Sequence, residues 1–200
     1  MKSHVRALTL LLTLAAGALA QPQLQPRVNG KPVYDVDVLP AVESSLARMW
    51  DSADAVIDVR IERSAVKGTE RPSVYGREQL PLVSTLHTAA VLRVLKGEVK
   101  KSSTIVFSQS AGQLEMADKI VRIAGVEPLA AGERYVVFLR RNESAGSWIL
   151  AGDRDGAFKL REGWVESQGM SVVAREQNHL SERAFGEQLD RIARRSKPKA

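Results

Sequence analysis

The stretch Leu129-Ala130-Ala131-Gly132-Glu133-Arg134-Tyr135-Val136-Val137-Phe138-Leu139-Arg140-Arg141-Asn142 decides the fold. Gly132 is typical of a turn that needs a positive φ. Residues 135–139 form an unbroken run of aromatic, β-branched and aliphatic side chains, which is typical of a strand buried on both faces. Polar residues then return the chain to water. The stretch predicts a turn that leads into the central strand of a β-barrel or β-sandwich.

The first 20 residues have the pattern of a secretory signal peptide. Lys2, His4 and Arg6 make a positive start, residues 7–16 are mainly apolar, and Ala18-Leu19-Ala20 provides a small-residue cleavage site. This apolar segment is too short to span a membrane, which takes about 20 residues. We expect cleavage near Ala20 and a secreted or periplasmic protein. The chain contains no cysteine, so disulfides and thiol chemistry are excluded.

Positive charge is concentrated at the end of the chain. The formal net charge is +6, but Lys2 and Arg6 belong to the expected signal. Residues 189–200 hold five of the basic residues and one acid, which leaves 22 basic and 22 acidic residues in 21–188. A neutral body has no net field to attract nucleic acid, so we expect no nucleic-acid partner. The basic tail over 193–200 is interpreted as a solvated end, or alternatively as a weak attachment to anionic envelope lipid or polymer.

The residues before the central stretch predict a helix followed by several strands. Gln, Pro and Asn are frequent over 21–39, which we interpret as a flexible leader. Val42, Leu46 and Met49 form an apolar stripe that Trp50 widens, so we expect a helix from Pro40 that ends over 51–54. A strand is expected over 55–62, with Ile57, Val59 and Ile61 on its buried face and Asp58, Arg60 and Glu62 on its solvated face. A long loop over 64–81 follows, and then a strand over 86–96 that places Leu86, Ala90, Leu92 and Val94 on one face. The next expected elements are a strand over 104–107, a loop over 108–118 and a weak strand over 119–124.

The residues after the central stretch predict hairpins and a final helix. Strands are expected over 148–151 and 157–161 around a turn at 152–156, and a second hairpin turn at Arg161-Glu162-Gly163 leads into Trp164. Residues 171–174 are expected to add an edge strand. Ser181 can cap a helix with an apolar stripe at Phe185, Leu189 and Ile192. These patterns predict a mainly β fold, an antiparallel OB-like barrel with a helix near each end, as one domain over 40–192.

Three segments resemble one known family. They are Ser52-Ala53-Asp54-Ala55-Val56, the run Val91-Leu92-Arg93-Val94-Leu95-Lys96-Gly97, and residues 132–139. Their order is similar to that of the netrin-like module, the OB-type barrel that also occurs in tissue inhibitors of metalloproteinases, and of related secreted bacterial domains. The resemblance covers about residues 52–166 and implies a fold more than a function. The family's inhibitory N-terminal cysteine has no counterpart here, since the expected mature chain begins at Gln21.

Candidate catalytic and metal-binding patterns are weak throughout. His87 and His179 lack the spacing of a zinc motif, and we interpret both as structural or surface residues. Asp153-Arg154-Asp155-Gly156 resembles the start of a calcium loop, but the next ligand positions hold Ala157 and Trp164, so a hairpin turn is the preferred interpretation. Ser108-Gln109-Ser110-Ala111-Gly112 lacks the first glycine of a nucleophile elbow. We expect no catalytic residue, cofactor or metal.

The remaining prediction is a non-enzymatic binding module. It would present the loops over 64–81, 108–118 and 152–156 to an unknown protein or an anionic envelope component, as a monomer that does not span the membrane. The candidate binding residues are Arg71, Tyr75, Arg77, Gln109, Gln113, Asp153, Arg154, Asp155 and Trp164. Two alternatives are a protease inhibitor of netrin-like type that acts through its loops, and a hydrolase built around His87 with Asp153 or Asp155.

Overall fold

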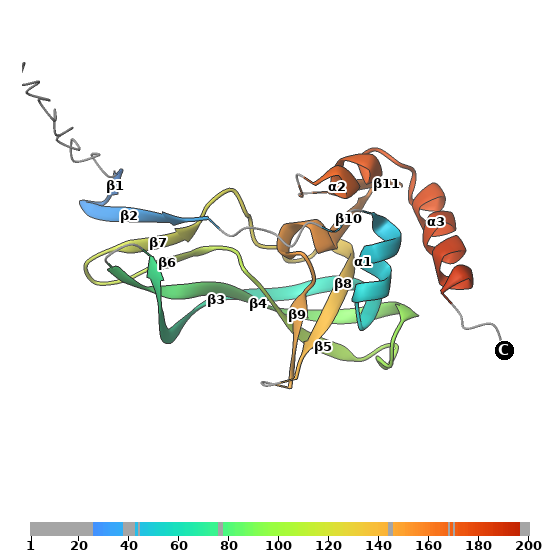
Figure 1. Ribbon diagram of the computed structural model, residues 1–200, viewed down its shortest axis with the longest axis horizontal. Coiled ribbons are helices and arrows are strands. Elements are labelled where there is room, and N and C mark those ends of the chain that lie inside the picture. Colours follow the sequence, from blue (N-terminus) through green and yellow to red (C-terminus); the bar gives the residue numbers. More distant parts are fainter. Residues whose placement is uncertain are drawn as a thin grey trace, which may run out of the picture.

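A computed structural model describes residues 26–37, 43, 45–75, 78–143, 146–167, 169 and 171–196. In these residues the protein is mainly β, with a closed five-stranded barrel and three α-helices. Figure 1 shows the helices gathered at one end of the molecule and a long two-stranded arm reaching away from them. The predicted fold class is confirmed, and the form of the barrel is compatible with an OB-like architecture.

Five strands close the barrel. In order around it they are β8 (Arg134–Asn142), β3 (Ala55–Tyr75), β4 (Glu78–Lys96), β5 (Thr104–Gln109) and β9 (Ser147–Leu150), and β9 pairs back onto β8. The pairings are antiparallel except for β5 with β9. Two further strands, β10 (Ala157–Arg161) and β11 (Trp164–Ser167), extend the sheet along β8.

The central strand β8 is buried on both faces, as predicted. Tyr135, Val137 and Leu139 point into the barrel, where they pack with residues of β3, β4 and β5. Val136 and Phe138 point to the opposite face and pack beneath the helices. The unbroken apolar run therefore serves two cores, because side chains alternate between the faces of a strand.

Three serines begin the three helices. They are α1 (Leu46–Ser52), α2 (Val172–Gln177) and α3 (Glu182–Arg195), and the hydroxyls of Ser45, Ser171 and Ser181 each accept a hydrogen bond from the backbone N–H three residues later. The predicted cap at Ser181 is confirmed. The edge strand predicted over 171–174 is wrong because Ser171 caps a helix. The start of the first helix near Pro40 and Val42 lies outside the described residues, and the helix begins at Leu46.

The long loop predicted over 64–81 is wrong. The backbone of β3 continues to Tyr75 and that of β4 begins at Glu78, and these two residues are paired. The ladder contains register shifts, one of them between Gly68 and Pro72, where Pro72 lies opposite Pro81. A bulge accommodates a glycine or proline that would otherwise interrupt a strand. Gly68, Pro72 and Pro81 therefore lie within the ladder and do not mark a loop. The end of β3 and the start of β4 thus form the long two-stranded arm seen in Figure 1.

A second sheet covers this arm. Its order is β1 (Arg27–Val28), β2 (Lys31–Val36), β7 (Ile120–Ile123) and β6 (Gln113–Glu115), with β2 parallel to β7. Val33 and Val36 are buried, and Val36 packs with Leu80 and Val83 of the arm. The flexible leader is therefore wrong for residues 27–36, and the loop predicted over 108–118 contains β6. The strand predicted over 119–124 is confirmed as β7.

The two predicted turns after β8 have different outcomes. Residues 152–156 are not a hairpin turn, because β9 and β10 both pair with β8 and the 3₁₀ turn η1 (Asp153–Gly156) interrupts one continuous edge. The turn at Arg161-Glu162-Gly163 is confirmed. Arg161 pairs with Trp164 across it, and Glu162 and Gly163 both have positive φ, as a tight hairpin turn requires.

Candidate functional site

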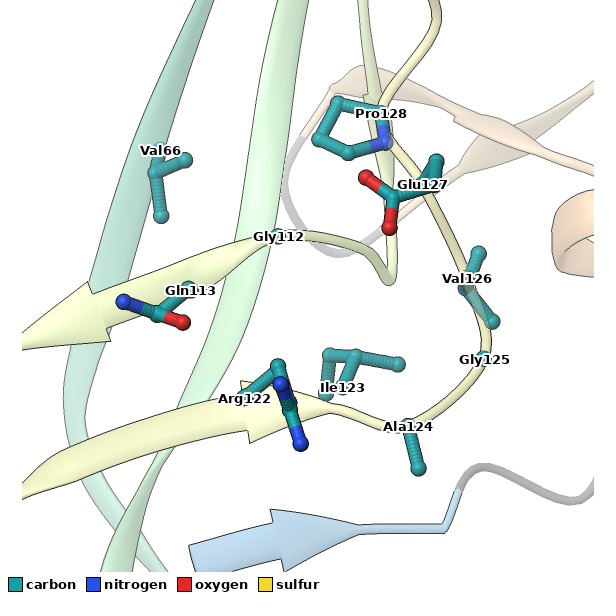
Figure 2. Close-up of a pocket in the computed structure, with 10 residues that line it drawn as sticks. All are labelled: Val66, Gly112, Gln113, Arg122, Ile123, Ala124, Gly125, Val126, Glu127 and Pro128. Atoms are coloured by element: carbon teal, nitrogen blue, oxygen red, sulfur yellow. The ribbon is translucent and has the colours of Figure 1, made fainter. Parts of the chain in front are cut away.

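A cleft lies between the arm and the second sheet. Its volume is about 680 Å³, within the range that ligand-binding clefts occupy. Figure 2 shows its walls, which come from β3, from the start of β6, from the end of β7 and from the turn that follows β7. The lining residues are Val66, Gly112, Gln113, Arg122, Ile123, Ala124, Gly125, Val126, Glu127 and Pro128.

Close packing fixes the wall of the cleft at Gly112. Its φ is +100°, and a Cβ atom at this position would lie 2.9 Å from Thr85 Oγ1 and 3.0 Å from Val66 Cγ2. Thr85 Oγ1 in turn donates a hydrogen bond to the carbonyl oxygen of Ala111 at 2.8 Å. A side chain at 112 would be strained and crowded, so glycine is what lets the chain pass this close to the arm.

Two charged side chains, those of Arg122 and Glu127, line the cleft and lie near enough to interact electrostatically. The Arg122 guanidinium donates to both carboxylate oxygens of Asp35, at 2.8 and 3.0 Å, and these hydrogen bonds raise the pKa of Arg122. Arg122 is thereby committed to the neighbouring strand β2. Glu127 is exposed on the turn opposite Gln113 and Arg122 (Figure 2). The cleft therefore presents an acidic group to an incoming ligand.

A buried polar chain stands behind the cleft. His87 is 0% exposed, with Nδ1 2.8 Å from Ser64 Oγ and Nε2 2.9 Å from Gln109 Oε1. Gln109 Oε1 also accepts a hydrogen bond from Leu129 N–H at 3.3 Å, and its amide nitrogen donates to the carbonyl oxygen of Glu127 at 3.4 Å. The Ser64 hydroxyl donates to the carbonyl oxygen of Leu129 at 3.1 Å, so Ser64, His87 and Gln109 form one hydrogen-bonded chain that reaches the turn at residues 127–129. These hydrogen bonds connect the turn after β7, which lines the cleft, to β3 and β4.

This Ser64–His87–Gln109 order has the form of a nucleophile, a base and an orienting group. A base must also reach the leaving group of the substrate. His87 is sealed from solvent and packs against Phe107, with 5.2 Å between ring centroids. Asp155, considered as its partner, is buried at η1 and accepts from Ser171 N–H. The hydrolase site considered around His87 therefore lacks a base that substrate can reach.

The burial of His87 also corrects the predicted faces of β4. His87, Ala89 and Val91 point inward, whereas Leu92, expected on the buried face, is exposed. Burial lowers the pKa of His87, against a smaller raising effect of the hydrogen bond that its ring makes to Gln109. The structural role predicted for this histidine is consistent with its hydrogen bonds.

We expect acid to destabilise the protein through His87. Its pKa is lowered in the fold, so below about pH 6.5 the unfolded chain binds more protons than the native one, and the free energy of unfolding falls by up to about 1.4 kcal/mol per pH unit. Urea unfolding at pH 7.5, 6.5 and 5.5 measures this slope. His87→Gln should flatten it, while His179→Gln, at an exposed histidine, should not. An unchanged slope in His87→Gln contradicts the prediction.

The structure separates the predicted binding residues. Gln113 lines the cleft, whereas Trp164, 54% exposed, lies in the β10–β11 hairpin. Gln109 and Asp155 are 1% and 2% exposed, which corrects their expected place on presented loops. Arg77 lies outside the described residues, and only the backbone is described at the following positions: Arg71 and Tyr75 in β3, and Asp153 and Arg154 in η1.

The cleft residues Arg122 and Glu127 were missed by sequence reasoning. Each lies in a short segment whose local pattern predicts only a weak strand or a turn. Their meeting with Val66 and Gln113 depends on how β3, β6 and β7 pack, and no spacing in the sequence encodes that arrangement.

Comparisons with known proteins assign the chain to no family. The chain matches no protein-family model and no curated protein. Over the residues that the structure describes, no helix is both long and apolar enough to cross a membrane, and no three His, Asp or Glu side chains are grouped to hold a metal ion.

Proposed function

We propose that the protein is a secreted or periplasmic, non-enzymatic binding module whose cleft binds an extended segment of a protein partner. The cleft between the arm and the second sheet carries this proposal. Its volume of about 680 Å³ accommodates several side chains of a peptide, and strands and a tightly packed glycine form its walls. Walls that are ordered before binding lower the entropic cost of association.

The charge of the cleft supports a partner segment with a lysine or arginine. Glu127 is exposed, and Arg122, the basic residue among the described residues of the lining, directs its hydrogen bonds to Asp35, although its charge also interacts with that of Glu127. Complementary charge favours encounter and selects among partners more than it adds affinity. The signal-like N-terminus supports the location, and the five-stranded barrel is compatible with an OB-like fold.

A charge reversal in the cleft tests the proposal. Crosslinked capture from the native cell envelope would use the wild-type protein, Glu127→Arg, and Glu187→Arg as a matched control. Glu187 is exposed on α3, where it pairs with Arg183 at 3.3 Å. We expect a partner that is retained by the wild type and by Glu187→Arg and is released by Glu127→Arg.

Two results would contradict this function. Equal capture by all three proteins would place recognition outside the cleft. Loss of the partner from a version that ends at Ile192, with full retention by Glu127→Arg, would instead assign binding to the basic tail over 193–200 as electrostatic surface attachment. Purified partner fragments with and without their basic residues would then confirm which charge Glu127 recognises.

A further inference from the structure

A second hollow lies at the β10–β11 hairpin, with a volume of about 400 Å³. One aromatic residue and four charged or polar residues line it: Trp164, Arg161, Glu162, Glu166 and His179. It shares no lining residue with the cleft near Glu127. The inference drawn from it is therefore independent of the proposed function.

The hairpin places three of these side chains on one face. Arg161 and Trp164 are cross-strand partners, and Glu166 follows two residues after Trp164, so all three point away from the core, whereas the intervening Val165 is fully buried. Trp164 remains 54% exposed. A large aromatic side chain in this position offers contact area at low entropic cost.

The free edge of β11 is already covered. Val165 N–H donates to the carbonyl oxygen of Leu180 at 2.9 Å, His179 N–H donates to the carbonyl oxygen of Val165 at 2.9 Å, and Glu182 N–H donates to that of Gly163 at 2.7 Å. An added peptide strand has no main chain to pair with there. A ligand of this hollow must therefore be recognised by side chains.

Unusual backbone conformations meet at this hollow. Four non-glycine residues of the described chain have positive φ, namely Asn29, Ser102, Glu162 and His179, and the last two line the hollow with φ of +53° and +66°. The hairpin turn accounts for the conformation of Glu162, whereas His179 lies outside any such turn, in a conformation that is uncommon for residues other than glycine. The two conformations bring a carboxylate and an imidazole to the rim around Trp164.

The chemistry of the lining distinguishes between classes of ligand. A protein hot spot is surrounded by apolar contacts and depleted of charge, whereas every neighbour of Trp164 in this hollow is charged or polar. An anionic membrane surface is disfavoured by two carboxylates against one guanidinium. A sugar ring has an apolar C–H face and a rim of hydroxyls that both donate and accept hydrogen bonds, which matches an exposed indole surrounded by carboxylates, a guanidinium and an imidazole.

We propose that the hollow formed by Arg161, Glu162, Trp164, Glu166 and His179 is a saccharide-binding site. A neutral sugar ring stacks on Trp164. Its hydroxyls donate to the Glu166 carboxylate and bridge the Arg161 guanidinium and the Glu162 carboxylate, which form an ion pair at 3.7 Å. The site holds one or two rings of a longer polymer, so the affinity for a short oligosaccharide is weak.

The test is a titration of the full chain with three defined probes, which are chitotetraose, cellotetraose and maltotetraose. Binding is followed by ligand-observed NMR and by tryptophan fluorescence. Trp50 is buried, so the change in emission reports mainly on the more accessible tryptophans. We expect saturable binding of at least one probe, weakened roughly tenfold or more in Trp164→Ala and to a smaller degree in Glu166→Gln. Val172→Ala, at another residue that is 54% exposed, serves as the matched control and should bind as the wild type does.

Three outcomes overturn the proposal. The first is the absence of binding for all three tetrasaccharides up to about ten millimolar, which corresponds to a binding free energy weaker than about 3 kcal/mol. The second is binding that persists unchanged in Trp164→Ala. The third is a Trp164-dependent association with phosphatidylglycerol vesicles in place of sugar. Circular dichroism of each variant verifies that the hairpin change has not unfolded the chain. Because the cleft variant Glu127→Arg leaves this hollow intact, failure here and failure of the proposed partner cleft remain distinguishable.

Discussion

Replacing Arg134 with methionine should lower the free energy of unfolding by about 3 kcal/mol. The Arg134 guanidinium forms two hydrogen bonds with Asp58, at 2.9 and 2.6 Å, and an ion pair with Glu182 of α3 at 2.7 Å. Asp58 is only 5% exposed, so the variant leaves a buried carboxylate without its partner. The figure is at the lower end for a broken buried pair because the Arg134 side chain is itself 36% exposed and admits water. Urea unfolding at neutral pH measures the loss.

Arg183→Met provides the matched control for that variant. Arg183 and Glu187 form an exposed pair on α3, which should contribute less than about 0.5 kcal/mol. The double variant Asp58→Asn, Arg134→Met should recover part of the stability, since it removes the unpaired charge. If Arg134→Met unfolds at the same urea concentration as Arg183→Met, the ion pair between Asp58 of β3 and Arg134 of β8 does not contribute the predicted stability.

Gly156→Ala should destabilise the fold by about 3 kcal/mol or more. Gly156 ends η1, and a Cβ atom there would overlap the carbonyl oxygen of Ala151 and lie 3.0 Å from its carbonyl carbon. These are backbone atoms between two strands that pair with β8, so neither side can move without disturbing the barrel. Thermal and urea unfolding of the variant measure the effect.

The matched control for Gly156→Ala is Gly186→Ala. Gly186 lies within α3, and a Cβ atom there meets no other atom within 4 Å. Alanine should stabilise this helix by about 0.5–1 kcal/mol because it reduces the entropy of the unfolded chain. Opposite signs for the two alanines are expected, and equal effects would contradict the role of close packing at Gly156.

Asp58 also shows where reasoning from a local pattern fails. The alternation in residues 55–62 predicts one solvated face, and Arg60 and Glu62 are indeed exposed. Val56 and Asp58 on that face are buried, because the helices and Arg134 cover it. Alternation correctly predicts a strand, but only the packing of distant elements decides which face meets water.

The central strand and the helix cap at Ser181 could be predicted because their signals are local and strong. The apolar run of β8 and the serine before the stripe of α3 need no knowledge of the rest of the chain. The arm could not be predicted, since it depends on bulges that carry Gly68 and Pro72 within a ladder. The cleft depends on how β3 of one sheet packs against β6 and β7 of the other, so its residues have no local signal.

The parallel pairing of β2 with β7 limits when the N-terminal strand can fold during synthesis of the chain. Val33 lies opposite Ile120, so the two members of the pair are 87 positions apart in the sequence. At about 5–20 residues per second, translation delivers the second strand several seconds after the first. During that interval Val33 and Val36, which are buried in the finished fold, have no sheet to join. The N-terminal strand therefore cannot join its sheet until residues 120–123 have been made, and until then the nascent chain exposes two valines that the finished fold buries.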